Sequence, residues 1–166
     1  NLIITENHAH YGGGMYNSDS APTITNVTFA GNTASFDGGG IYNSSSNPVL
    51  NHVVFDNNIT ESTSSGSGYG GGMYSVYGGS TLTNVTFVNN NARLGGGVYN
   101  HFSPSTITNT TFSNNLADYG GGIFNSESTY VTLENATFTG NTANVSGGGM
   151  YNTNGFVRLN HVTISG

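Results

Sequence analysis

The sequence predicts an all-β fold, a parallel β-helix (β-solenoid) in which successive coils of the chain stack into a rod. Two short motifs, NVTFAGN at 26–32 and DGGGIYN at 37–43, recur with small changes about every 26 residues. Within them apolar and polar side chains alternate with a period of two, which is typical of strands and not of helices. A single coil cannot bury its apolar side alone, whereas stacked coils can, with equivalent strands about 4.8 Å apart.

The repeat divides the chain into about six coils of one domain, residues 1–166. Aligned on the first motif, the coils begin at Asn1, Asn26, His52, Asn84, Asn109 and Asn135, and a partial coil begins at His161. We expect three short strands in each coil, joined by turns rich in Asn, Ser, Gly and Pro. The third coil is longer than the others, and its extra segment, residues 59–69, is predicted to form a surface loop.

Equivalent positions of neighbouring coils form columns, and these columns explain the composition. A charge repeated in a column would face its own copy at about 4.8 Å, which destabilises the stack, and only 6% of the residues are charged. Neutral amides can instead hydrogen-bond along the column. We predict a structural ladder of Asn7, Asn32, Asn58, Asn90, Asn115 and Asn141, a second polar column of Asn17, Asn43, Ser75, Asn100, Asn125 and Asn152, and an inner column of Ile4, Phe29, Phe55, Phe87, Phe112, Phe138 and Ile164.

A column of small residues predicts a tight corner of the coil. Its members are Ala9, Ala34, Ala92, Ala117 and Ala143. Arg93 and Asp118 share one coil position in adjacent coils, and we expect their side chains to meet at the surface.

The glycine triplets do not predict a nucleotide site. A phosphate-binding loop continues into Lys and then Ser or Thr at the start of a helix, and this chain has no lysine and no helical pattern. We interpret the triplets as corners that need a positive φ or a close backbone approach. Gly39 is expected to face inward, and the third glycine of each triplet is expected to face outward.

A row of aromatic residues is predicted on the outside of the rod, beside these outward glycines. Such a row suits contacts with a neighbouring rod or with a glycan, and it can equally serve only to stabilise the sheet. The row and the glycines beside it include Gly14, Tyr16, Gly40, Tyr42, Tyr74, Tyr99, Phe124 and Tyr151.

Composition argues against several classes of partner. The net charge is −6, with eight acidic residues and two basic ones, so we expect no binding to nucleic acid. No apolar run reaches the roughly 18 residues that a membrane span needs. Cysteine is absent, so no disulfide is predicted. No residue pattern indicates a cofactor, and we expect none.

Candidate catalytic and metal-binding groups are scattered. Glycoside hydrolysis needs two carboxylates about 5–10 Å apart, which in a stacked rod requires matching positions of adjacent coils. Asp19 and Glu127 share a coil position but belong to coils far apart in the stack, and no adjacent pair stands out. His8 and His10 lie on one side of a strand, but two imidazoles do not complete a zinc site. We therefore predict no enzyme, and no metal site beyond these two weak candidates.

An outward column of threonines runs beside the first residue of most coils: Thr28, Thr86, Thr111, Thr137 and Thr163. A flat face of Thr and Asn can order water, so ice binding is one alternative, although His52 and Val54 interrupt this face. The same strands spell N-x-T sequences, which leave glycosylation open at Asn26, Asn84, Asn109 and Asn135.

The two motifs, GGG[MIV][YF]N and F-x-x-N, resemble the paired GGA[ILV] and FxxN repeats of chlamydial polymorphic outer membrane proteins. The resemblance covers the whole chain and implies a β-helix, mostly right-handed among such proteins. It also implies an extracellular or cell-surface location and, often, an adhesive role. This chain has a third glycine where that family has alanine.

Neither end of the sequence shows a capping segment, and both ends are versions of the same strand. The last strand of one copy can pair with the first strand of another, which builds a filament; alternatively the ends are cuts in a longer array. The end residues are Asn1, Leu2, Ile3, Ile4, His161, Val162, Thr163 and Ile164.

We predict a non-enzymatic extracellular structural protein, a homo-oligomeric fibre subunit that stacks head to tail and packs sideways through the Gly and Tyr stripe. An adhesin that binds a host or surface glycan is the alternative. Ice binding and carbohydrate-active catalysis are further alternatives.

Overall fold

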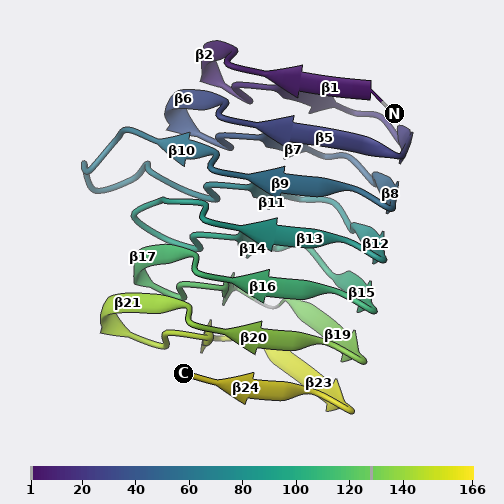
Figure 1. Cartoon of the computed structure of the whole chain (residues 1–166), viewed down its shortest axis with the longest axis vertical. Helices are drawn as coiled ribbons and strands as arrows, with labels where there is room; N and C mark the ends of the chain where they lie inside the picture. The colour runs from purple at the N-terminus through teal and green to yellow at the C-terminus, as the bar shows by residue number, and fades with distance from the viewer. Residues whose placement is uncertain (1, 128) are drawn as a thin grey trace.

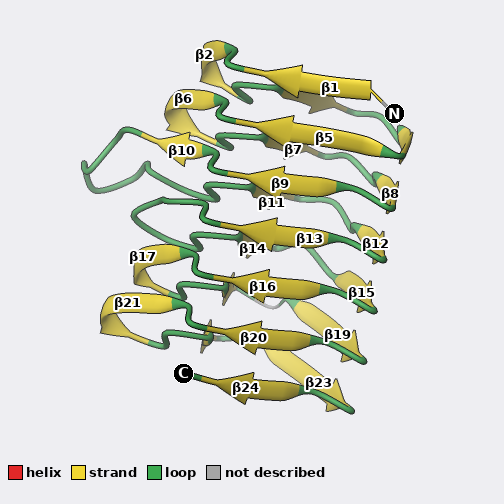
Figure 2. Cartoon of the chain, viewed as in Figure 1, coloured by secondary structure: helices red, strands yellow, loops and turns green. Residues whose placement is uncertain are grey.

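The structure, a computed structural model, describes residues 2–127 and 129–166 and is a stack of coils along one axis (Figure 1). Strands pair with equivalent strands of the neighbouring coils, and every pair in the described part of the chain is parallel. The same part contains strands and loops but no helix (Figure 2). The predicted parallel β-helix is confirmed. Asn1, one of the predicted end residues, lies outside the described residues.

The strands follow one another in the same order in successive coils. The first two coils contain β1 (Leu2–Thr5), β2 (His8–Tyr11), β3 (Met15–Ser18), β4 (Thr23–Thr25), β5 (Val27–Ala30), β6 (Thr33–Asp37), β7 (Ile41–Ser44) and β8 (Val49–Asn51). The next two contain β9 (Val54–Asp56), β10 (Ile59–Thr60), β11 (Met73–Val76), β12 (Thr81–Thr83), β13 (Thr86–Val88), β14 (Val98–His101) and β15 (Ser105–Thr108). The remainder contains β16 (Thr111–Ser113), β17 (Leu116–Tyr119), β18 (Ile123–Ser126), β19 (Tyr130–Glu134), β20 (Thr137–Thr139), β21 (Thr142–Ser146), β22 (Met150–Thr153), β23 (Phe156–Asn160) and β24 (Thr163–Ser165).

The coil has four sides, and not the three that we predicted. Sheet A is β1-β5-β9-β13-β16-β20-β24, sheet C is β3-β7-β11-β14-β18-β22 and sheet D is β4-β8-β12-β15-β19-β23. Sheet B, the extra side, has two parts, β2-β6-β10 and β17-β21. Apart from the alanine column its strands share no motif, and they change in length from coil to coil, so a period of two cannot be recognised there from the sequence.

Residues with a left-handed backbone form the corners between these sides. The first residue of each coil from Asn26 to His161 has a φ between 50° and 56°. Asparagine adopts this conformation more readily than most residues with a side chain, which explains why it recurs there. We expected Asn26 and its copies on the outward face of a strand; the structure places them at the corner before that strand.

The core consists of columns that run the length of the rod. The predicted Phe column is confirmed: successive rings from Phe29 to Phe138 stack nearly parallel, with centroids 4.6–5.1 Å apart. Ile4 and Ile164 pair with the two ends of this column. Buried aliphatic side chains of sheets C and D face it. Each fully buried side chain of this size contributes about 1.5–3 kcal/mol to folding, so the stack of coils is held from inside.

The alanine column, which we expected at a tight corner, lies within strands of sheet B, where Ala9 pairs with Ala34 and Ala117 with Ala143 and the register shifts just after them. In the third coil Thr60 takes the alanine position, and its buried Oγ1 has no hydrogen-bond partner in the described residues. The insertion is shorter than predicted, because Ile59 pairs with Thr33 and Tyr69 pairs with Leu94. The inserted loop is therefore residues 61–68, and it protrudes from the side of the rod after β10 (Figure 1).

Candidate functional site

A ladder of asparagines runs along the corner between sheets A and B, and Asn58 shows how it is bonded. Its Nδ2 donates to Oδ1 of Asn90 in the next coil at 3.0 Å and to the carbonyl of Phe29 in the previous coil at 2.9 Å. Its Oδ1 accepts from the backbone N–H and from Nδ2 of Asn32, at 3.1 and 3.0 Å. The amide thus uses both N–H donors and both lone pairs, without water.

Equivalent bonds join all six predicted members of this ladder, from Asn7 to Asn141. Successive members are 25, 26, 32, 25 and 26 residues apart. The four inner asparagines are completely buried. A buried polar group without a partner costs about 1–3 kcal/mol, so the ladder is favourable because each coil completes the bonding of the next. The second polar column is bonded similarly where it consists of asparagines, for example from Asn100 to Asn125 at 2.9 Å.

Each of the three positions in a triplet requires glycine for a different structural reason. The first, such as Gly38 with a φ of 68°, turns the corner in a left-handed conformation. The second allows two backbones to approach: a Cβ on Gly39 would lie 2.4 Å from the carbonyl oxygen of Gly71. The third leaves room for the core, because a Cβ on Gly40 would lie 2.9 Å from Cδ1 of Phe55.

The predicted outward direction of the third glycines is therefore wrong. Gly40 faces the Phe column, and its equivalents Gly14, Gly72, Gly97 and Gly122 likewise face Phe rings. We had extended the period of two backwards from β7 through the triplet. The chain bends between the corner glycine and β7, so the alternation does not apply there.

The aromatic row is present in register, but most of it is not on the surface. Tyr74 pairs with Tyr42 on one side and Tyr99 on the other, and Tyr74 and Tyr99 are each only 6% exposed. Phe124 is also buried, whereas Tyr16 is 53% exposed. The row is covered by the residues that precede the triplets, and these covering side chains are Tyr69, Leu94 and Tyr119.

The prediction of a continuous exposed stripe is thus wrong for the middle coils. Sequence reasoning missed the covering residues because it assigned no direction to the position before the corner. The repeated occurrence of Tyr or Leu at that position, in 69, 94 and 119, is the signal that could have identified them.

Burial also changes the pKa of three tyrosines in the aromatic row. Desolvation raises the pKa of Tyr42 to about 12, with the nearby Asp37 adding to the rise. Desolvation likewise raises the pKa values of Tyr74 and Tyr99. The hydroxyl of Tyr99 lies 2.9 Å from Oγ of Ser126, one more polar group that is satisfied internally. These phenols stay neutral at physiological pH and do not supply a base.

Asp37 is a buried acid in the column that covers the aromatic row, where it pairs with Tyr11 of the previous coil. Its Oδ1 accepts a hydrogen bond of 3.0 Å from the backbone N–H of Tyr69, the residue at which the inserted loop rejoins the rod. Burial raises the pKa of Asp37 to about 6, opposed by backbone hydrogen bonds from Tyr69 and Gly68 and by the charge of Arg93. The carboxyl group of Asp37 therefore holds the end of the inserted loop by a hydrogen bond, and in doing so it loses contact with water.

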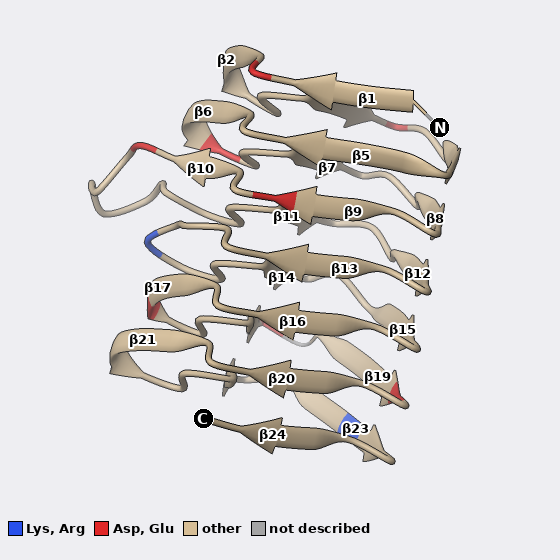
Figure 3. Cartoon of the chain, in the orientation of Figure 1, with Lys and Arg blue, Asp and Glu red and all other residues tan. Residues whose placement is uncertain are grey.

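The other acidic residues and the two arginines are spread along the rod (Figure 3). In the described part of the chain, no three His, Asp or Glu side chains lie close enough to hold a metal ion. Nε2 of His8 lies 3.2 Å from Oγ of Ser35, and the ring of His10 packs on Phe36 with centroids 5.5 Å apart. Some carboxylates accept a hydrogen bond from an asparagine amide of a neighbouring coil, as Asp56 does from Asn89.

The expected contact between the side chains of Arg93 and Asp118 is not formed. Nε of Arg93 donates to the carbonyl of Ser67 at 2.9 Å, and the guanidinium lies over the ring of Tyr69, 5.5 Å from its centroid. Oδ1 of Asp118 accepts from Nδ2 of Asn144 at 3.0 Å. The inserted loop offers Arg93 these alternative partners, and the path of that loop could not be foreseen from the repeat.

The four asparagines of the N-x-T sequences lie exposed at the corner before sheet A. Nδ2 of Asn135 donates to Asn109 at 3.2 Å, and Nδ2 of Asn109 donates to Asn84 at 3.3 Å, so these three form an outer amide ladder. The threonine column lies beside it on sheet A, with Val54 between Thr28 and Thr86. Glycosylation stays a prediction.

In the described residues, no helix is long and apolar enough to cross a membrane.

The end residues other than Asn1 lie on or beside the outermost strands of sheet A. β1 pairs only with β5 and β24 only with β20 among the described strands. Leu2 is 59% exposed and Ile3 63%, and at the other end Ile164 is 54% exposed. Each end of the stack thus presents strand edges. Leu2 and Ile164 occupy positions that the neighbouring coil buries, as Val27 and Phe138, whereas Ile3 lies on the outward face beside Thr28.

Two segments of the chain, residues 26–44 and 109–126, match the family model described as the Chlamydia polymorphic membrane protein (Chlamydia_PMP) repeat. These coils are similar to Chlamydia polymorphic membrane protein repeats. The likeness predicted from the two motifs is thereby confirmed. Neither the curated proteins nor the solved structures yield a match to the chain.

Each segment that matches the polymorphic membrane protein repeat extends from the first residue of a coil through sheet A, sheet B and the strand of sheet C. One such repeat therefore corresponds to three sides of one coil. This chain has a third glycine where the GGA pattern has alanine. At Gly40, the methyl group of an alanine would lie 2.5 Å from the carbonyl oxygen of Gly72.

Proposed function

We propose that the chain is a non-enzymatic structural rod of a bacterial surface protein, and that copies of it join head to tail into a filament. The likeness to polymorphic membrane protein repeats supports a place at the cell surface, associated with the outer membrane. The neutral, internally bonded columns support a structural role, because they fix the rod at every coil.

The filament proposal rests on one observation, which is that the strands at the two ends of the rod match each other in sheet, direction and inner column. β1 and β24 occupy the same sheet, and both run parallel to their partners. Ile4 and Ile164 occupy the same inner column. A second copy placed beyond β24 would therefore continue sheet A and the inner column in the same direction. Such a head-to-tail contact does not close on itself, so it generates an open filament.

The lateral contact through the Gly and Tyr stripe is not part of this proposal. The third glycines face the core, and Tyr74, Tyr99 and Phe124 are covered. The alternative of an adhesin that binds a glycan through the same stripe is disfavoured for the same reason, because these residues are not exposed. Val54 interrupts the threonine column, which disfavours ice binding.

The test is the assembly state of the purified chain at increasing concentration, followed by sedimentation velocity and negative-stain electron microscopy. We expect filaments one rod wide. Ile164→Asp should leave single rods, because stacking would bury an unpaired charge, while the control Val49→Asp, on the side of the rod and 42% exposed, should still form filaments. Discrete monomers of the unmodified chain at high concentration would refute the proposal, and so would filaments of Ile164→Asp.

A further inference from the structure

The strongest departure from the regular repeat lies on sheet B, between the inserted loop and the last coils. In the fourth coil this side has no named strand and is represented only by bridges at Asn91 and Leu94. The inserted loop 61–68 lies on one side of this coil and β17 on the other (Figure 1). In repeat proteins, insertions often mark the binding face, and loops on a rigid scaffold commonly carry binding groups.

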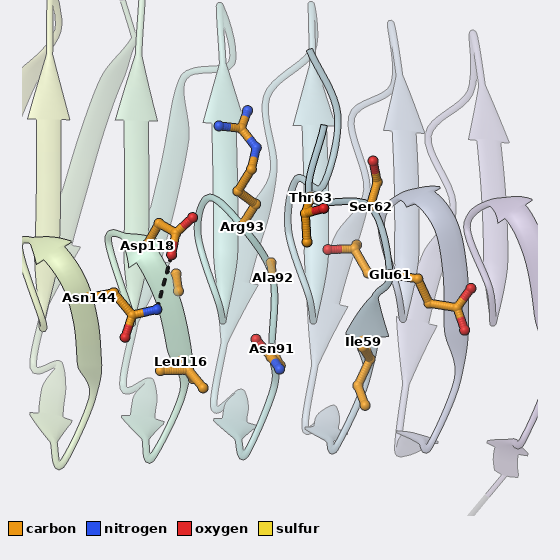
Figure 4. Close-up of a pocket in the computed structure, with 12 residues that line it drawn as sticks. Ile59, Glu61, Ser62, Thr63, Asn91, Ala92, Arg93, Leu116, Asp118 and Asn144 are labelled. Atoms are coloured by element: carbon orange, nitrogen blue, oxygen red, sulfur yellow. Dashed lines mark hydrogen bonds between the residues drawn. The ribbon is translucent and has the colours of Figure 1, made fainter. Parts of the chain in front are cut away.

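A cleft of about 560 Å³ lies in this part of sheet B, and we name it the Arg93 cleft. Its floor includes Ile59, Asn91 and Leu116, which lie in a row across three coils (Figure 4). Arg93, Asp118 and Asn144 also line it. The volume lies within the range of about 300–1,000 Å³ that is usual for small-molecule sites.

The polar groups of the Arg93 cleft retain free hydrogen-bonding capacity. Arg93 is fixed by Nε and by Tyr69, and in the described residues its two Nη nitrogens make no hydrogen bond. Figure 4 shows its guanidinium turned away from Asp118, whose carboxylate is bonded to Asn144. The amide of Asn91 is likewise unbonded and exposed among the described residues. These groups supply both donors and acceptors, held on a rigid sheet.

A second hollow of about 260 Å³ adjoins the first at Arg93, which lines both. Its walls are aromatic and include Tyr119 and Tyr151, with ring centroids 5.3 Å apart. Together the two hollows offer polar groups and aromatic rings next to one fixed guanidinium.

We propose that the Arg93 cleft and this aromatic hollow bind a neutral oligosaccharide. A sugar ring carries hydroxyl groups around its rim, which suit the amides, the carboxylate and the guanidinium. Its C–H faces suit aromatic and aliphatic side chains such as Tyr119 and Leu116. Glu61 and Asp118 both line the cleft and outnumber its one arginine, which disfavours an acidic ligand. The floor offers no free strand edge for a peptide, because the backbone N–H groups of Asn91, Ala92 and Asp118 are already bonded.

The repeat itself supplies substitutions that preserve the fold, because another coil shows which residue is tolerated at each position. Asn91→Thr uses the residue of the second coil, Thr33, since both pair with Ile59. Tyr119→Leu uses Leu94, with which Tyr119 pairs. Asp118→Ser removes the carboxylate. The control Thr81→Val uses Val49, which pairs with Thr81 on sheet D, away from the cleft.

Binding is measured by saturation-transfer NMR and titration calorimetry. The neutral probes are maltotriose, cellotriose, mannotriose and triacetylchitotriose, and the acidic probes are sialyllactose and a hyaluronan tetrasaccharide. We expect at least one neutral probe to bind the unmodified chain. Asn91→Thr, Asp118→Ser and Tyr119→Leu should each weaken that binding at least tenfold, without loss of the folded state by circular dichroism, while Thr81→Val should bind as before. Binding of no neutral probe at millimolar concentration, binding of acidic probes alone, or binding that the cleft variants leave unchanged would each overturn the proposal.

Discussion

Replacing Asn90 by alanine tests whether the buried amide ladder holds the coils together. The substitution removes the Oδ1 that accepts from the backbone N–H and from Nδ2 of Asn58, both at 3.0 Å. It also removes the Nδ2 that donates to Phe55 and to Asn115, at 3.0 and 2.9 Å. Four hydrogen bonds are lost in a region that is fully buried.

The magnitude follows from these four bonds. At about 1 kcal/mol for each bond, with about 1 kcal/mol more for the backbone N–H of Asn58 left unbonded, the loss of stability is roughly 4–5 kcal/mol. For a chain of this size about 1 kcal/mol corresponds to 2–4 °C, so the melting temperature should fall by about 8–20 °C.

The assay is thermal and urea unfolding followed by circular dichroism. The matched control is Asn91→Ala, which removes the amide of the adjacent exposed residue and should change the stability by less than about 0.5 kcal/mol. If the free energy of unfolding of Asn90→Ala lay within about 1 kcal/mol of that of the unmodified chain, the ladder would not stabilise the rod and the reasoning would be refuted.

Two further substitutions test the core and the buried acid. Phe87→Asp should prevent cooperative folding, because it places an unpaired charge between the rings of Phe55 and Phe112; an ordinary melting curve by circular dichroism would contradict this. Asp37→Asn should raise stability at pH 8 by about 1–3 kcal/mol and have little effect at pH 4. The pKa of Asp37 is raised to about 6 in the folded chain, so its carboxyl group destabilises the fold increasingly as pH rises from about 4 through 6. Equal effects at both pH values in urea unfolding would exclude that explanation.

The architecture of the rod could be predicted from the sequence because each of its columns repeats. Phe29 and Asn32 belong to columns of one residue type, so their partners in the next coil followed from alignment alone, and the structure confirms both columns. The four-sided shape could not be predicted, because sheet B differs in length and residues from coil to coil.

The direction of side chains near the corners was predicted less well. A period of two applies only along an extended strand, and the left-handed residue Gly38 interrupts it. Gly40 was therefore assigned to the wrong face, and the cover over Tyr74 was missed. The Arg93 cleft depends on how the inserted loop returns to the rod at Tyr69, which no repeat pattern describes.

The near identity of the coils has a consequence for how the chain reaches its native pairing. A coil that skipped its neighbour and paired with the next one would still match phenylalanine to phenylalanine and asparagine to asparagine, so such a slip would differ little in energy from the correct order. The irregular positions distinguish one coil from another. Asp37 bonds to Tyr69 only when the second and third coils are adjacent, and Arg93 reaches Ser67 only when the fourth coil follows the third. The least regular residues of the rod are therefore the ones that encode the sequence order of its coils.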